Sequence, residues 1–592
     1  MARDVSPWPI TSYGWAPADM RYRFDWITPL TISPHDHNRV YVGAQVVFMT
    51  TDAGQSWRAI SPDLTTNTKA HQQNSGGISA DNLTTYDGGT LYAIAESPVT
   101  AGIIWTGSDD GQVNVTRDGG AHWMNVTKNI PDLPPWGTVW SIAPSRFDAA
   151  SAYVVVNLQH QADYDARVYK TTNYGASWKL ISGSVPKGVN SSAHIIVEDP
   201  VRKGMLYLGT DNSVYVSWDD GGHWTALRNN MPPAPVYWLT IQKQFNDLLV
   251  GTYGRGIWIL DDVTPLRDYA AAAKSDAYLF KPRAAYRFRT FDNTRQSDAG
   301  SHVLGENPEY GADINFNLKE AVKKAEISIA GADGKTIRTI KLEKGAKAGL
   351  NRVWWDLKYD PSTEVKLRTS PPGQPWVAVG KQGWRPFVAW SHFDGAPRAV
   401  PGKYTVKLSV DGKDFSAPLE VLPDPHTLGT PKDVEAEVQF LLEIRGEMND
   451  VAGMINHLEW TRKQVEDLEK MLGDEPKNAA ALKAARDFEQ KAIAVENSLV
   501  DVSLTGRGED SFRAPMRLYG RLMNLGSLLD GAPGQGSSGA DLPPTTQEIE
   551  VNKLYQGEIA QARKSFEEFT TKDVAALNEA LRASHLGTTI AP

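Results

Sequence analysis

The 592-residue sequence contains no cysteine. Disulfide bonds, thiolate metal sites and cysteine nucleophiles are therefore excluded. The sequence also lacks any run of about eighteen apolar residues, so we expect no membrane-spanning helix. Its opening stretch, Met1 to Pro9, has no apolar core of the kind found in secretory signals. The sequence itself therefore predicts no signal peptide.

Positive charge is not in excess, because 61 Lys and Arg residues face 70 Asp and Glu residues, for a net charge of −9. Proteins that bind DNA or RNA carry a basic surface for the phosphate backbone. We therefore expect no nucleic acid partner. No His and acidic residues stand at metal-ligand spacing, and the run from Gly251 to Gly256 is followed by no helix, as a dinucleotide loop requires. The sequence predicts no cofactor and no metal.

What the sequence does contain is one short turn, repeated four times, with the pattern Ser/Thr-x-Asp/Asn-x-Gly-x-x-Trp. The copies begin at Thr50, Thr116, Thr171 and Ser217. Asp or Asn at the third place can accept hydrogen bonds from the backbone N–H groups that follow. Gly at the fifth place adopts a positive φ without steric cost. We therefore interpret the third residues of the four copies as structural and not catalytic: Asp52, Asp118, Asn173 and Asp219.

Each copy of the turn belongs to a longer unit of about four strands. Five such units follow one another, roughly 45 to 65 residues apart, which is the period of propeller blades. The fifth unit ends at Asp261 to Pro265 and lacks the full turn. Because most propellers have more than five blades, we expect the ring to be completed by a segment N-terminal to this chain or by a partner, such as a second copy.

Three domains are predicted, at 1–267, 275–423 and 430–592. The first holds the blades, and an Ala-rich linker, Tyr269 to Lys274, follows it. Alternating strands with a hairpin turn at Ala332 to Lys335 then indicate an immunoglobulin-like sandwich. Thr430, followed by Pro431 and Asp433, is typical of a helix start, and the apolar residues after it recur every seven positions. The last domain is therefore expected to be a helical bundle.

The repeated turn resembles the Asp box of BNR-repeat propellers, found in sialidases, xyloglucanases and the sortilin ectodomain. The stretches Pro29 to Asp36, Trp105 to Gly111 and Gly251 to Asp262 are similar to bacterial proteins described as sortilin-like or as glycosyl hydrolases with BNR repeats. The resemblance implies a mainly β fold: an Asp-box β-propeller of about five blades, an immunoglobulin-like β-sandwich and a C-terminal α-helical bundle. It also implies that the chain matches the C-terminal half of such a protein, and that the location is periplasmic or extracellular. The ten-cysteine module of sortilins is absent.

Strand order places the candidate site on the face opposite the repeated turns, where the turns between second and third strands meet the loops that join blades. Glycoside hydrolysis needs two carboxylates about 5–10 Å apart. The catalytic candidates on this face are Asp81, Asp109, Asp110 and Asp211, and the ligand-binding candidates are Gln45, Asn212, Tyr253 and Arg255. The alternative interpretation is that Asp and Asn in short turns only close those turns.

Two further residue types bear on the choice of activity. Sialidases of this propeller class use three arginines and a tyrosine nucleophile, but only Arg255, beside Tyr253, stands at a matching place, so we do not expect sialidase activity. His194 begins an apolar strand, and we interpret it as a core or rim histidine and not as a ligand.

Three functions remain open at this point. The leading hypothesis is an extracytoplasmic binding or scaffold protein that holds a glycan or a peptide, because the repeats come without an identifiable catalytic set. The second is a glycoside hydrolase that acts on a polysaccharide with paired Asp residues. The third is an assembly subunit whose propeller is completed by another chain.

Overall fold

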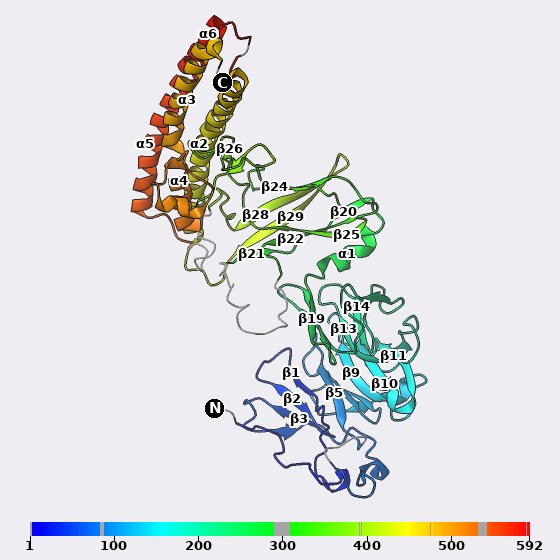
Figure 1. Ribbon diagram of the computed structural model, residues 1–592. Helices are drawn as coiled ribbons and strands as arrows, with labels where there is room; N and C mark the ends of the chain where they lie inside the picture. The colour runs from blue at the N-terminus through cyan, green and yellow to red at the C-terminus, as the bar shows by residue number, and fades with distance from the viewer. Residues whose placement is uncertain are drawn as a thin grey trace. The chain divides into compact units, whose positions relative to one another are not determined.

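The structure is a computed structural model that describes residues 3–82, 88–288, 308–389, 391, 393–473, 475–530, 541–587 and 589–591. The chain divides into two compact units, Met1–Ala270 and Ala271–Pro592 (Figure 1). The fold is mainly β, with antiparallel sheets in both units and long helices in the second. In the described part of the chain, no helix is both long and apolar enough to cross a membrane.

The first unit consists of five antiparallel sheets, which we number one to five in chain order. In each sheet the strands pair in the order of the sequence, so every strand follows its neighbour by a hairpin. Sheets one to four have four strands and sheet five has three. Their bounds are β1 (Leu30–Ile32), β2 (Val40–Gly43), β3 (Val47–Thr50), β4 (Arg58–Ala59); β5 (Leu91–Glu96), β6 (Ile104–Ser108), β7 (Val113–Thr116), β8 (Met124–Asn125); β9 (Thr138–Pro144), β10 (Ala152–Leu158), β11 (Asp163–Thr171), β12 (Lys179–Leu180); β13 (Ala193–Glu198), β14 (Leu206–Thr210), β15 (Val214–Ser217), β16 (Thr225–Leu227); and β17 (Val236–Gln242), β18 (Asp247–Thr252), β19 (Ile257–Leu260).

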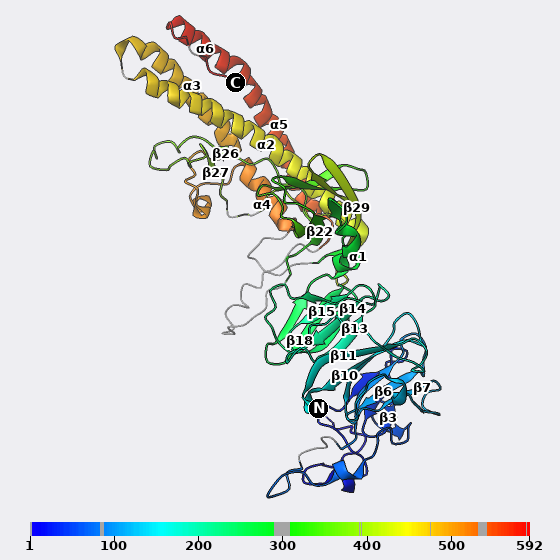
Figure 2. The same ribbon diagram turned by 90° about the vertical axis from the view of Figure 1, so that its right-hand side faces the viewer.

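Successive sheets pack face to face, and Figures 1 and 2 show them following one another along the unit. Because side chains alternate across a strand, each sheet has two apolar faces to bury. Val155 and Val168 of sheet three, for example, share one cluster with Ile196 and Leu208 of sheet four. The core of this unit is therefore a series of similar interfaces between sheets, with no single centre.

The repeated turns have the hydrogen bonds that the sequence predicts. In the fourth copy, the His223 N–H donates to Asp219 Oδ1 (2.8 Å). The Gly221 N–H donates to Ser217 Oγ (2.9 Å), and Gly221 has a φ of 86°. The same bond to the third residue closes the other turns: Ser56 N–H to Asp52, His122 N–H to Asp118 and Ser177 N–H to Asn173. The acidic and amide side chains at this place are thus engaged in the turn.

The tryptophan that ends a turn connects one sheet to the sheet before it. The Trp224 Nε1–H of sheet four donates to the carbonyl of Ile181, which follows β12 of sheet three (2.8 Å). Trp123 of sheet two makes the same bond to the carbonyl of Ile60, which follows β4 of sheet one (3.0 Å). In these two turns, the neighbouring sheet provides the acceptor for the indole N–H.

The second unit begins with two sheets. One has the order β20-β22-β25 and the other the order β21-β29-β28-β23-β24, with β21 parallel to β29. Their apolar faces share one core that includes Phe316, Trp355 and Val406. The bounds are β20 (Ala277–Leu279), β21 (Ala285–Arg287), β22 (Ala312–Leu318), β23 (Ala325–Ala330), β24 (Thr336–Leu342), β25 (Gly349–Trp355), β28 (Gly402–Val410) and β29 (Lys413–Pro423).

The helices of the second unit are α2 (Pro431–Leu472), α3 (Ala479–Leu499), α4 (Leu518–Asp530), α5 (Thr546–Glu568) and α6 (Val574–Ala583). Thr430 caps α2 as predicted, in a reciprocal capping box with Asp433. The short hairpin of β26 (Lys366–Leu367) and β27 (Arg385–Pro386) contacts α2, where the Lys366 N–H donates to Asn456 Oδ1 (2.7 Å). Short 3₁₀ turns and one π turn are Pro17–Asp19, Lys69–Gln72, Thr127–Asn129, Gln159–Gln161, Pro476–Asn478, Gly508–Phe512 and Phe569–Asp573.

The connection between the two units is more regular than its composition indicated. The predicted linker from Tyr269 to Lys274 is largely helical, because α1 spans Thr264–Ala272. Pro265 near the start of this helix has its φ fixed close to the helical value, and the alanines that follow have the highest helix propensity.

Replacing Asp219 with Ala should destabilise the first unit by about 1 kcal/mol, because the turn then loses the acceptor for its closing N–H. The matched variant Asp219→Asn should lose less, since Asn173 closes the third turn with an amide oxygen. Thermal unfolding followed by near-ultraviolet circular dichroism measures both. Equal melting temperatures for Asp219→Ala and the unchanged protein would contradict a stabilising role for the turn.

Candidate functional site

The first strands of sheets two to five each contain a β-bulge at the same place. In sheet two, Leu91 pairs with Ser108 and Ala93 with Gly107, so the register shifts at Tyr92. A bulged residue leaves the regular alternation of a strand, which changes the direction of its side chain. The bulged residues of the four sheets are Tyr92, Trp140, His194 and Tyr237.

The four bulged side chains contact one another across four different sheets. The ring centroids of Tyr92 and Trp140 lie 5.0 Å apart, and those of Trp140 and His194 4.9 Å apart. Tyr237 lies 4.3 Å from His194 and 5.7 Å from Trp140, to which it is nearly parallel at 25°. Tyr253, in the turn between β18 and β19, extends the series with a centroid 5.5 Å from Tyr237. We call these five residues the bulge row.

Four of the five rings in the bulge row are at least partly exposed to solvent, and the fifth is buried. Tyr92, Trp140 and Tyr237 are partly exposed, and Tyr253 is 71% exposed. His194 is fully buried, and its Nε2 lies 2.7 Å from Asp211 Oδ1. We conclude that His194 serves as the packed base of the row, while the other four rings form its surface.

Asp211 is held between two donors. One carboxylate oxygen faces His194 Nε2, and the other accepts from Gln159 Nε2 at 2.6 Å. With Asp211 as the acceptor, His194 Nε2 bears the proton, and Nδ1 is a buried atom with no recorded partner among the described residues. Burial raises the pKa of Tyr237, and the nearby charge of Asp211 adds to this shift. The phenol therefore stays a hydrogen-bond donor at neutral pH.

Two predicted residues, Asp211 and Tyr253, belong to or support the bulge row. Asn212 follows Asp211, and its side-chain oxygen lies 3.4 Å from the hydroxyl oxygens of Thr210 and Tyr215. Arg255 is exposed, and its carbonyl accepts from Trp258 Nε1 at 2.9 Å.

Gln45 and Asp81 lie in the part of the unit that precedes sheet two. Gln45 is buried, accepts from the Arg23 N–H at 2.8 Å and donates to the carbonyl of Arg21 at 2.9 Å. Both ends of its amide are therefore hydrogen-bonded to the backbone of the segment before β1. Asp81 is exposed, and its N–H donates to the carbonyl of Ser75 at 2.9 Å.

Asp109 and Asp110 are buried in the turn after β6 and are fully hydrogen-bonded. Asp109 accepts from the Thr90 N–H at 2.7 Å and from the Asp110 N–H at 2.8 Å. Asp110 accepts from both the N–H and the hydroxyl of Thr66 at 2.7 Å. Burial raises the pKa of Asp109 to about 7. The hydrogen bonds of Asp211 go to His194 and Gln159, which belong to sheets three and four and their turns, whereas Asp109 and Asp110 follow β6 of sheet two.

The sequence contained a signal for the bulge row that we did not use. When the first strands are aligned, the second position is aromatic or His in every case: Leu91-Tyr92, Val139-Trp140, Ala193-His194 and Val236-Tyr237. A large planar side chain repeated at one place of four units indicates a shared role. The interpretation of His194 as a core residue agrees with its burial.

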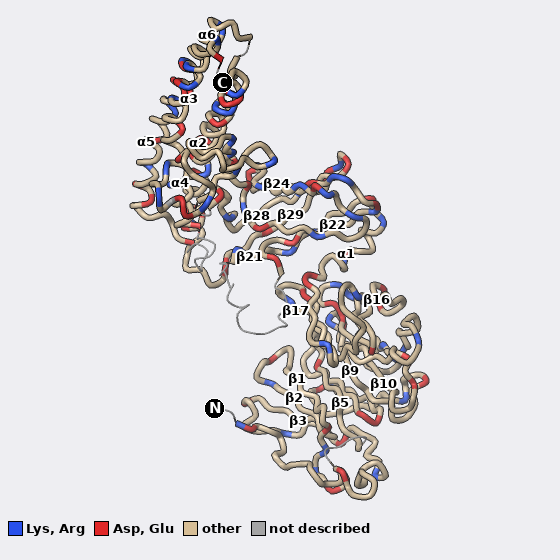
Figure 3. Tube along the Cα trace, viewed as in Figure 1, with Lys and Arg blue, Asp and Glu red and all other residues tan. Residues whose placement is uncertain are grey.

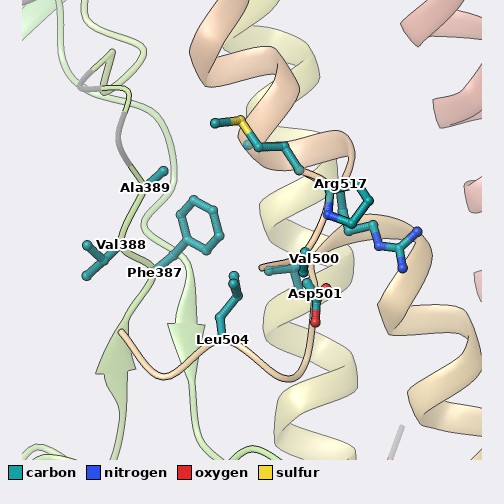
Figure 4. A pocket seen from close by; sticks show the side chains of 11 residues that line it. Phe387, Val388, Ala389, Val500, Asp501, Leu504 and Arg517 are labelled. Carbon is teal, nitrogen blue, oxygen red and sulfur yellow. The ribbon is translucent and has the colours of Figure 1, made fainter. Parts of the chain in front are cut away.

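Two hollows lie in the second unit. Figure 4 shows a pocket in the second unit, lined by side chains that include Phe387, Val500, Leu504 and Arg517. Its volume of about 30 Å³ is close to that of one water molecule. A wider hollow of about 400 Å³ shares Phe387 and is floored by Tyr519. Within the described residues, no group of three or more His, Asp and Glu side chains is placed to hold a metal ion.

No protein-family model matches the chain, and no curated protein matches it. Among solved structures, the GH74 xyloglucanase from Xanthomonas campestris is 16% identical over 65% of this chain and 63% of its own length, with a TM-score of 0.31. The GH74 enzyme of Niastella koreensis is 14% identical over 40% of this chain and 30% of its own, with a TM-score of 0.25. YCF48 from Cyanidioschyzon merolae is 13% identical over 43% and 71%, with a TM-score of 0.28. The chain thus spans less than two thirds of the length of both GH74 enzymes.

Replacing Asp109 with Asn should make the first unit less sensitive to pH. The pKa of the buried carboxyl is raised from 3.8 to about 7, so its protonated form is stable in the fold and ionisation is costly. Its contribution is fully present below pH 3.8 and is lost as the pH rises through 7. The stability of the unchanged protein should therefore fall relative to Asp109→Asn between pH 4 and 7, by at most about 1.4 kcal/mol per pH unit. Melting temperatures across this range measure the difference, and a constant difference would contradict the assignment.

Proposed function

We propose that the first unit is a partial β-propeller of five blades, one for each sheet, and that it binds a glycan along the bulge row. The observation that supports this proposal is the set of four successive bulges that bring Tyr92, Trp140, His194 and Tyr237 into contact. Regular strands would direct these side chains into the interfaces between sheets. Instead, strand pairing shifts register once in each of four sheets, and the side chains at these shifts form one aromatic surface.

The chemistry of the row suits a sugar chain. A pyranose ring has a flat face of C–H groups and an edge of hydroxyls, whereas an aromatic ring has a flat apolar face, and in Tyr and Trp a polar atom at its edge. Trp140 and Tyr237 are nearly parallel and partly exposed, so they can contact successive sugar units. The hydroxyls of Tyr237 and Tyr253 can then bond the sugar edges, as polar groups do in apolar ligand sites.

Binding without hydrolysis is the better-supported form of this function. Asp109 and Asp110 are buried and already accept hydrogen bonds from Thr90 and Thr66. The raised pKa of Asp109 would suit a general acid, but a general acid must reach the glycosidic oxygen. Asp211 is partly buried, with both oxygens already accepting bonds.

A peptide ligand is the alternative occupant of the same row. Aromatic surfaces also bind extended, Pro-rich peptides, whose rings pack on Trp and Tyr. As part of this proposal, we place the protein outside the cytoplasm as a scaffold, with an immunoglobulin-like sandwich and a helical bundle in its second unit. Figure 3 shows Lys and Arg interspersed with Asp and Glu along the described trace, in line with a net charge of −9.

Replacing Trp140 with Ala should weaken glycan binding at least tenfold, which corresponds to about 1.4 kcal/mol. The loss follows from removal of a ring that contacts three members of the row. Affinity electrophoresis in gels that contain soluble β-glucan, xylan, mannan or pectin identifies the retarding polysaccharide. Isothermal titration with that polysaccharide then gives the dissociation constants.

Tyr164→Ala is the matched control, because Tyr164 is an exposed aromatic residue of β11 outside the row. It should bind like the unchanged protein. Equal binding by all three proteins, or retardation by none of the polysaccharides, would contradict the glycan proposal, and a Pro-rich peptide library would then test the alternative. If the protein releases reducing ends from the polysaccharide, and Asp211→Asn abolishes this release, then the function is hydrolysis and not binding alone.

A further inference from the structure

One contact recurs at the interfaces between successive sheets of the first unit. Three sheets have a glycine in the second strand paired with a valine of the third strand: Gly43 with Val47, Gly107 with Val113, and Gly209 with Val214. These valines are 0 to 1% exposed. The glycines are needed for close approach, since a Cβ at Gly107 would lie 2.2 Å from Val139 of the next sheet.

Sheet five has the same pair, but no other described residue buries it. Gly251 pairs with Ile257, and Ile257 is 76% exposed. A Cβ at Gly251 would approach only Trp238 of its own sheet, which is itself 65% exposed. Ile259, two residues after Ile257 and so on the same face, is also exposed. Sheet five therefore presents the same kind of face that buries Val47, Val113 and Val214 elsewhere.

The first strand of sheet one shows the opposite half of this interface, whereas Tyr22 and Phe24 of the N-terminal segment pack on Phe48 of its third strand. The residue of the first strand that packs on the preceding sheet is Ile94, Ile142, Ile196 or Leu239 in sheets two to five, and each is buried. Register places Leu30 at this position in sheet one, opposite Val42. Leu30 is 66% exposed, and Ile32 and Trp26 beside it are exposed as well.

We propose that a second copy of this chain covers both faces, with sheet five of each copy packed on sheet one of the other. The two exposed faces are the two halves of one repeating interface, so each is the natural counterpart of the other. Ile257 of one copy then takes the place of Val47 or Val113, and Leu30 of the other takes the place of Ile94 or Ile142. Two such contacts related by a twofold axis close the assembly as a dimer and cover both sets of exposed apolar residues.

Sedimentation velocity at several protein concentrations tests this proposal. The unchanged chain should sediment as a dimer. Leu30→Asp and Ile257→Asp should each raise the dissociation constant at least tenfold, because either introduces a carboxylate into a buried apolar contact. Both residues are exposed in the single chain, so neither variant should disturb folding. Val189→Asp, at an exposed apolar residue elsewhere in the unit, should leave the dimer intact.

The absence of cysteine allows a direct test of the pairing. Chains with Leu30→Cys and chains with Ile257→Cys, mixed and then mildly oxidised, should form a disulfide-linked dimer, whereas neither variant alone should. A monomer at every concentration would overturn the proposal, and would point to a different protein or to further sheets of a longer polypeptide. Larger open assemblies, or equal cross-linking in the unmixed samples, would overturn it too. The outcome is independent of glycan binding, which the bulge row of a single chain would still perform.

Discussion

A β-sheet with two apolar faces needs a neighbour on each side, and this requirement governs the first unit. Three features make the contacts between successive sheets: glycines at which two sheets approach closely, aliphatic side chains of the third strands, and the tryptophans of the turns. Hydrophobic burial supplies the main driving force, while the indole hydrogen bonds fix how one sheet lies against the next. No sheet of this series can bury its core alone, as in other repeat proteins.

The same requirement explains why the candidate site needs bulges. In a regular strand every side chain points to one of the two packed faces. A residue can leave those faces only where the register breaks, and Tyr92, Trp140, His194 and Tyr237 are the residues at which it does. Structural and binding roles are thereby separated along a single strand. Ile142 packs between sheets, for example, while Trp140, two residues earlier, belongs to the bulge row.

Local signals in the sequence were sufficient for much of the fold. The turns, the strand positions and the cap at Thr430 depend on neighbouring residues, and the structure has them where they were expected. The bulges could not be located in this way, because a register break is a relation between two strands. The burial of Asp109 and Asp110 could not be predicted from the sequence either. Their hydrogen-bond donors are Thr90 and Thr66, which are distant in the sequence.

The third repeated turn differs from the other three in one respect that concerns acid. Hydrogen bonds from Ser56 lower the pKa of Asp52 to about 2, and the pKa values of Asp118 and Asp219 are lowered too. Each of these three carboxylates loses its stabilising charge as the pH falls through its own lowered pKa. Asn173 makes the same closing bond without a charge. The closing bond of the third turn, in sheet three, is therefore the one of the four that does not depend on a charged side chain.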